Sequence, residues 1–167
     1  KYVQLDAATL TLPMLRSIVK EHLGCSLRDL YAGHFSPCCK SYSSADSGKS
    51  GYRLPDGRPN PRPLNSDGSV NLDRYAYACK WDEIVTTVLR TFEELSKENP
   101  EVLLTVENPT AHFRSHPSVV RLVSGSHATF QLLEVDYCKA AHPHFDGDRL
   151  FTKKPTDSLV YGVKLGL

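Results

Sequence analysis

The chain has 167 residues, which fits a single domain with a full hydrophobic core, spanning residues 1–167. Lysine and arginine number 20 against 19 aspartates and glutamates, so overall charge gives no argument for nucleic acid, and any polyanion contact needs a local cluster. No apolar run is long enough to span a bilayer, and an odd count of 5 cysteines argues against a disulfide framework and favours an intracellular, reducing compartment.

The first predicted elements are a short strand, a helix and a second strand. Residues 2–5 read as a strand that ends at Asp6, and apolar side chains then recur at helical spacing over residues 12–22. The run over residues 30–35 lacks polar alternation until His34, so this second strand is predicted to be buried on both faces of a sheet.

Residues 43–79 are predicted to form a long irregular loop, because they hold 4 prolines and 4 glycines among serines, aspartates and asparagines. A loop of this length in a compact domain is either a functional lid or a disordered insertion, and the core elements on both sides favour the lid. Its basic residues could contact a polyanion or form an ordinary solvated surface: Lys49, Arg53, Arg58 and Arg62.

The second half of the chain opens with a helix predicted over residues 81–97. Residues 102–106 are the clearest buried strand, and they deliver Glu107, Asn108 and Pro109 to its C-terminal end. The remaining predicted elements are a short helix over residues 117–123 and strands over residues 130–138 and 158–163.

This alternation of strands and helices predicts an α/β fold with a mostly parallel sheet flanked by helices. In such sheets ligands gather at the C-terminal ends of the strands. Cys38, Cys39 and Glu107 all follow predicted strands, so this placement favours a functional interpretation of each.

The chemistry available at these positions is nucleophilic and acidic. A cysteine at a strand end can attack as its thiolate, although a buried, inert thiol is the commoner case. A disulfide between Cys38 and Cys39 is disfavoured because adjacent Cα atoms lie too close for a relaxed bridge. A partly desolvated Glu107 would have a raised pKa and could donate a proton, whereas the alternative is a structural glutamate.

Four short motifs occur in the order Ser36–Ser43 (SPCCKSYS), Glu107-Asn108-Pro109, Tyr137-Cys138 and Lys154-Pro155-Thr156-Asp157. Together they resemble the cytosine-C5 DNA methyltransferases, most closely the short, divergent methylase-related proteins of phages and viruses, over about residues 30–163. The resemblance implies a Rossmann-like methyltransferase domain, S-adenosylmethionine as cofactor, DNA as partner without a membrane, and a nuclear or virus-associated location in the cell.

The resemblance also implies residue roles. Counting back from Tyr42 and Ser43 places Cys39 at the nucleophile position and Cys38 where the family usually has proline. In the implied mechanism Cys39 adds to C6 of a flipped cytosine, Glu107 binds the exocyclic amine and protonates N3, and C5 then takes a methyl group. The implied supporting residues are Pro37, Ser43, Pro109 and Asn108, of which Asn108 would hold the Cys39 loop. The loop over residues 43–79 would close over DNA, with nucleic-acid contacts from Arg53, Arg58, Arg62 and Lys154.

The family's glycine-rich turn for the methyl donor is missing from this chain. The strand over residues 2–5 resembles a later donor-site strand, with Asp6 near the adenine as the predicted cofactor-binding residue. Two strands of the family sheet are then missing as well, so the domain is expected to be N-terminally incomplete, with an upstream segment or a partner chain completing the sheet, or to have lost its donor site.

Two other functions stay open at this point. One is a catalytically inactive methyltransferase-like scaffold or interaction domain. The other is a zinc-stabilised binding domain that uses Cys138, His142, His144 and Asp146, although this spacing does not match a common closed zinc site and a solvent-facing loop is favoured, so no metal ligand is predicted.

Overall fold

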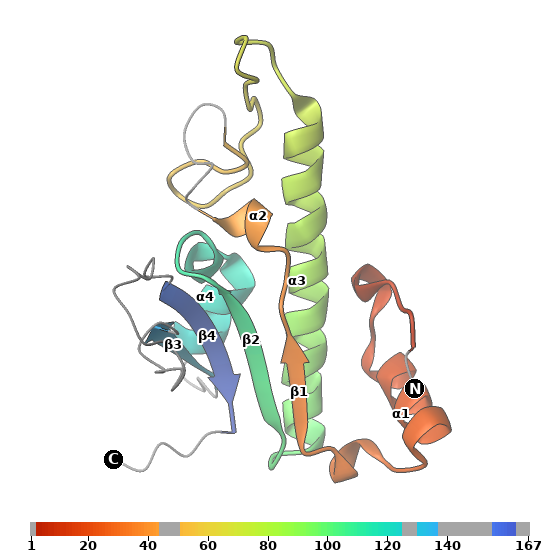
Figure 1. Ribbon diagram of the computed structural model, residues 1–167. Helices are drawn as coiled ribbons and strands as arrows, with labels where there is room; N and C mark the ends of the chain where they lie inside the picture. Colours follow the sequence, from red (N-terminus) through yellow and green to blue (C-terminus); the bar gives the residue numbers. More distant parts are fainter. Residues whose placement is uncertain (1–2, 44–50, 125–129, 137–154, 163–167) are drawn as a thin grey trace, which may run out of the picture.

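The computed structural model describes residues 3–43, 51–124, 130–136 and 155–162, which build an α/β fold with a four-stranded mixed sheet (Figure 1). The strands are β1 (Ala32–Phe35), β2 (Leu103–Pro109), β3 (Phe130–Asp136) and β4 (Pro155–Tyr161). The α-helices are α1 (Leu12–Leu23), α2 (Cys39–Tyr42), α3 (Leu72–Glu98) and α4 (Pro117–Ser124). Short 3₁₀ turns lie at η1 (Ala7–Thr9), η2 (Leu27–Asp29) and η4 (Phe113–Ser115).

The sheet has the strand order β1-β2-β4-β3, and only the β1–β2 pair is parallel. β4 runs antiparallel to both β2 and β3, so the prediction of a mostly parallel sheet is wrong for the described strands. The physical reason is the connection before β4. A parallel pair needs a crossover, which α3 supplies between β1 and β2, whereas no helix was predicted between the last two strands, and such a pair can return antiparallel.

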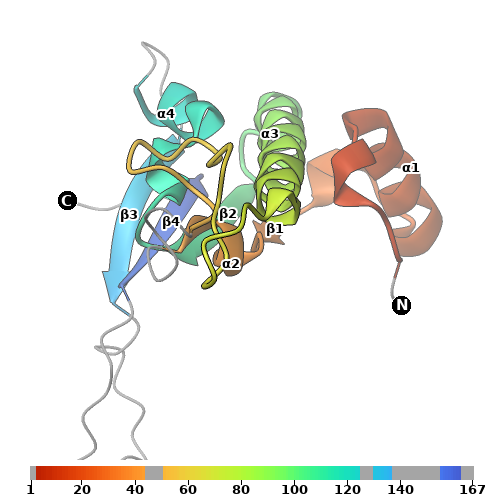
Figure 2. The same cartoon turned by 90° about the horizontal axis from the view of Figure 1, so that it is seen from above.

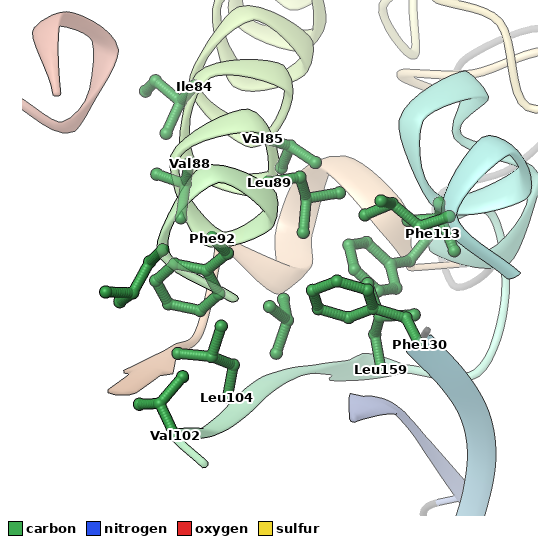
Figure 3. Packing of buried hydrophobic residues seen from close by; sticks show 14 of the residues in the cluster. Ile84, Val85, Val88, Leu89, Phe92, Val102, Leu104, Phe113, Phe130 and Leu159 are labelled. Atoms are coloured by element: carbon green, nitrogen blue, oxygen red, sulfur yellow. The ribbon is translucent and has the colours of Figure 1, made fainter. Parts of the chain in front are cut away.

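The hydrophobic core lies between the sheet and two helices, α3 and α4, which cover the same face (Figure 2). Side chains alternate along β2: Leu104, Val106 and Asn108 are buried, whereas the intervening side chains are half-buried. Figure 3 shows the buried side chains of α3 packed against those of the sheet and of η4, and the contacting set includes Val85, Leu89, Phe92, Leu104, Phe113, Phe130 and Leu159.

The beginning of the chain confirms the predicted helix but not the predicted strand. α1 begins after Thr11, whose hydroxyl accepts the Met14 N–H, and ends at Gly24 in the left-handed conformation with φ 72°. Residues 3–6 form no strand. The Asp6 carboxylate instead accepts the Ala8 N–H at 3.0 Å and caps η1, a local hydrogen bond that competes with strand pairing.

β1 was predicted to be buried on both faces, and this is wrong. Its residues alternate between exposed and half-buried, because β1 is at the edge of the described sheet and has one neighbour, β2. At Gly33 an added Cβ would meet Cδ2 of Leu104 on β2 at 3.0 Å and the ring of Phe92 on α3 at 3.6 Å. A larger residue here would require the end of the Leu104 side chain to shift by a few tenths of an ångström, so the position is tight for any side chain.

The long helix begins earlier than predicted, at Leu72 rather than residue 81. The predicted loop over residues 43–79 is correspondingly too long, and its described irregular part covers residues 51–71. This part is folded into two tight turns, marked by backbone bridges between Arg53 and Pro59 and between Leu64 and Val70. The first turns of α3 pack against this segment instead of the sheet, so the apolar stripe that marks the rest of the helix is missing from them.

The other predicted elements are confirmed with small shifts in their bounds. The strand over residues 102–106 is β2, and the helix over residues 117–123 is α4. The last two strands correspond to β3 and β4, while residues 137, 138 and 163 of the predicted ranges lie outside the described residues. Among the described residues, every helix is too short or too polar to serve as a membrane-spanning segment.

Candidate functional site

The parallel pairing of β1 and β2 brings two of the sequence motifs to the same edge of the sheet. Ser36 and Pro37 follow β1 directly, while Glu107, Asn108 and Pro109 are the last three residues of β2. The Ser36 hydroxyl lies 3.5 Å from Glu107 Oε2, and the Asn108 side-chain amide donates to the Pro37 carbonyl at 3.1 Å. The two motifs are thus in direct contact, although 71 positions separate them in the chain.

Part of a third motif lies at this edge as well. β4 begins beside the end of β2, so that Asn108 is opposite Asp157 and Pro109 is opposite Thr156. Asp157 is fully buried and accepts hydrogen bonds from Arg114 at 2.6 Å and from the Thr110 hydroxyl at 3.2 Å. These contacts attach the chain that follows β2 to the start of β4.

Asn108 is the residue at which these motifs join. Its side chain is 1% exposed, and it contacts the Pro37 backbone through Nδ2. Its Oδ1 has no hydrogen-bond partner among the described residues. This contact agrees in geometry with the predicted role of Asn108 in holding the Cys39 loop, while the catalytic consequence stays a prediction.

The two cysteines lie in different environments. Cys39 is the first residue of α2, a single turn that the Ser43 N–H closes by donating to the Cys39 carbonyl at 2.8 Å, and its side chain is exposed. Cys38 is half-buried, and its Sγ lies 2.8 Å from the hydroxyl oxygen of Tyr77 on α3. The exposed thiol is therefore that of Cys39, whereas Cys38 is held against α3.

Arg53 was predicted to contact nucleic acid, but its side chain is only 2% exposed. The guanidinium donates to the Ser41 carbonyl at 2.7 Å and to the Asp82 carboxylate at 2.6 Å, and it stacks over the Tyr42 ring at 4.0 Å. These contacts use the guanidinium donors and bury them, so they argue against the predicted contact of Arg53 with nucleic acid, which stays a prediction. We call Arg53, Ser41, Tyr42 and Asp82 the Arg53 cluster.

The Arg53 cluster attaches α2 to α3 and to the segment over residues 51–71. The Tyr42 hydroxyl donates to Asp82 at 2.9 Å, and burial raises the pKa of Tyr42 well above its usual range. His116 Nε2 lies 3.8 Å from Asp82, and burial lowers the pKa of this imidazole. A neutral His116 fits its other contact, because its Nδ1 accepts the N–H of Ser118 at the start of α4.

Sequence reasoning missed two residues of this region, Tyr77 and Asp82. Both lie on the part of α3 that faces α2, and no local pattern marks them, since their partners are 39 and 29 positions away. The available signal in the sequence was Tyr42, the aromatic residue of the Ser36–Ser43 motif, because its hydroxyl would need a partner if it were buried. A fully buried aromatic hydroxyl requires a hydrogen-bond partner, which here is Asp82.

Three further predicted site residues, Arg58, Arg62 and Asp6, lie within the described part of the chain. Arg58 is exposed and pairs with Asp56 at 2.7 Å, and Arg62 is also exposed. Asp6 caps η1 just before α1, and α3 lies between α1 and α2 in both views (Figures 1 and 2). The predicted positions outside the described residues are Lys49, Tyr137, Cys138, His142, His144, Asp146 and Lys154.

Across the described ranges, no three histidine, cysteine, aspartate or glutamate side chains gather closely enough to share a metal ion. No protein-family model, curated protein or solved structure matches the chain at a significant level.

Proposed function

We propose that this chain is a cytosine-C5 DNA methyltransferase-like domain, with Cys39 as the nucleophile and Glu107 as the acid. The observation that carries the proposal is the meeting of three motifs at one sheet edge. Asn108 contacts the Pro37 backbone, and β4 places Asp157 opposite Asn108. Strand pairing brings these motifs together at the edge where ligands gather in α/β sheets, which is the placement that a common site requires.

The described residues suit the covalent half of the reaction. The Cys39 thiolate would form a bond from Sγ to C6 of a cytosine flipped out of the duplex, and the electron pair of the C5–C6 double bond would move through the ring towards N3. Glu107 would give N3 its proton, which neutralises the developing charge. The exposed side chain of Cys39 leaves it accessible to a base delivered from outside.

The described residues do not fit S-adenosylmethionine. The predicted donor residue Asp6 is used as the cap of η1, and α3 separates its segment from α2. We propose that the donor site belongs to a Rossmann-like sheet that continues past β1, which is the edge of the described sheet. An upstream segment or a partner chain would supply those strands.

Methyl-donor binding by the complete native chain tests the enzyme assignment. We expect binding of S-adenosylmethionine, measured by isothermal titration calorimetry, and transfer of labelled methyl groups to cytosine-containing DNA. No donor binding by the complete chain, with no glycine-rich turn upstream of Lys1, would overturn the enzyme proposal in favour of the inactive scaffold, which the poor fit at Asp6 favours as the second candidate.

Glu107→Gln is expected to slow the reaction by about 10²- to 10⁴-fold, the usual contribution of a general acid, without unfolding the domain. Glu107 is half-buried on the face of β2 opposite to the core, so an uncharged isostere leaves the packing intact. Single-turnover methylation rates and thermal unfolding together check this result. The matched control is Glu101→Gln, an exposed carboxylate just before β2. An unfolded Glu107→Gln variant would instead indicate a structural role.

A further inference from the structure

Two basic side chains meet on one buried tyrosine beside α2. Lys40 Nζ lies 5.6 Å from the centre of the Tyr52 ring, and Arg74 Cζ lies 5.4 Å from the same point. Lys40 belongs to α2, Tyr52 to the segment over residues 51–71, and Arg74 to the first turn of α3. Three elements that are separate in the chain therefore combine to place two positive charges against one ring. We call Lys40, Tyr52 and Arg74 the cation pair site.

The arrangement needs an energetic explanation, because like charges repel at short range. Cation–π attraction to the 7% exposed Tyr52 ring offsets part of that repulsion. A hydrogen bond with Tyr52 raises the pKa of Lys40, so the ammonium stays charged at neutral pH. Lys40 itself is exposed, which leaves its charge available to an incoming anion.

The cation pair site is also connected to the two cysteines. Lys40 directly follows Cys39 in α2. On the other side, the Tyr52 ring packs against Tyr77 with ring centres 5.4 Å apart, and the Tyr77 hydroxyl contacts Cys38. A polyanion bound at Lys40 would therefore be held next to the exposed Cys39 thiol.

We propose that Lys40 and Arg74 bind a backbone phosphate of the DNA strand that carries the target cytosine. This inference rests on the proposed function. Tyr52 positions the two cations, and the phosphate sets the register of the strand relative to Cys39. Lys40 and Arg74 thus take the role that the sequence suggested for Arg53, which is buried in its own cluster.

The test is the salt dependence of DNA binding by the native chain. A fluorescein-labelled, cytosine-containing duplex of mixed sequence is titrated by fluorescence anisotropy from low to physiological salt. Lys40→Ala is expected to reduce the slope of log affinity against log salt by about 1, the loss of one phosphate contact, and Arg74→Ala is expected to act in the same direction. Lys40→Arg should keep the slope of the wild-type protein.

The controls are substitutions of exposed basic residues outside the cation pair site. The first control is Lys20→Ala, because Lys20 lies in the last turn of α1. The second is Arg90→Ala, because Arg90 lies on α3 about 24 Å from Arg74 along the helix axis, at 1.5 Å per residue. An unchanged slope in a folded Lys40→Ala variant, or an equal loss in the Lys20→Ala control, would overturn this inference alone. No binding of DNA by the wild-type chain would overturn the proposed function with it.

Discussion

Cys39→Ala is expected to abolish covalent trapping by a mechanism-based cytosine analogue in DNA, whereas Cys38→Ala is expected to retain trapping. Only a thiolate that can reach C6 can form the adduct, and alanine has no atom to replace it. The exposed side chain of Cys39 meets this requirement. Cys38 is half-buried with its sulfur against the Tyr77 hydroxyl, so its removal changes packing near the site rather than the reacting atom.

The measurement is a denaturing gel of the native chain after incubation with analogue-containing duplex and methyl donor, on which a covalent complex migrates as a retarded band. Cys79→Ala provides a matched control, since this half-buried thiol lies on α3 two residues beyond Tyr77. Thermal unfolding of each variant separates a lost nucleophile from a lost fold. Equal loss of trapping in the Cys39 and Cys38 variants would contradict the assignment of Cys39 as the nucleophile.

Arg53→Met is expected to lower the free energy of unfolding by about 3 kcal/mol, the lower end of the cost of breaking a buried ion pair. The substitution removes the donor to the Ser41 carbonyl and the cation that pairs with the Asp82 carboxylate, which keeps the hydrogen bond from the Tyr42 hydroxyl. The lower end applies because the Asp82 side chain is 26% exposed, so water can hydrate the carboxylate in part once the guanidinium is gone. Urea unfolding at neutral pH measures the difference.

Two further variants make this prediction specific. The double variant, which carries both Arg53→Met and Asp82→Leu, is expected to recover part of the lost free energy of unfolding, since it no longer buries an unpaired charge. Arg58→Met removes an exposed arginine that pairs with exposed Asp56, and it is expected to leave the free energy of unfolding almost unchanged. A loss as small for Arg53→Met as for Arg58→Met would mean that the guanidinium is free enough to contact DNA after all.

Local sequence patterns were sufficient where an element depends on its own residues. The apolar spacing and the glycine at position 24 located α1, because a helix forms its hydrogen bonds within the segment and ends where a left-handed residue is easily accommodated. The apolar run over residues 102–106 located β2. The same patterns failed for residues 3–6, where the Asp6 carboxylate accepts a hydrogen bond from the Ala8 N–H and no strand forms.

For the candidate site, too, some residues could be chosen from the sequence and others could not. The motifs carry the resemblance that implied Cys39, Glu107 and Asn108 as candidates and Asn108 near the Cys39 loop. They could not say that Arg53 is buried or that Lys40 and Arg74 share one ring, because the contacts of Arg53 with Asp82 and of Lys40 with Tyr52 join separate elements.

The sequence by itself determined the residue types available for chemistry and the local elements that carry them: the adjacent cysteines after one strand, and the carboxylate and amide at the end of another. Only the tertiary structure decided which cysteine is exposed, which arginine is buried and that β4 runs antiparallel between β2 and β3. The physical reason is that burial and strand direction depend on partners brought together by packing, and a local pattern contains no information about partners tens of residues away.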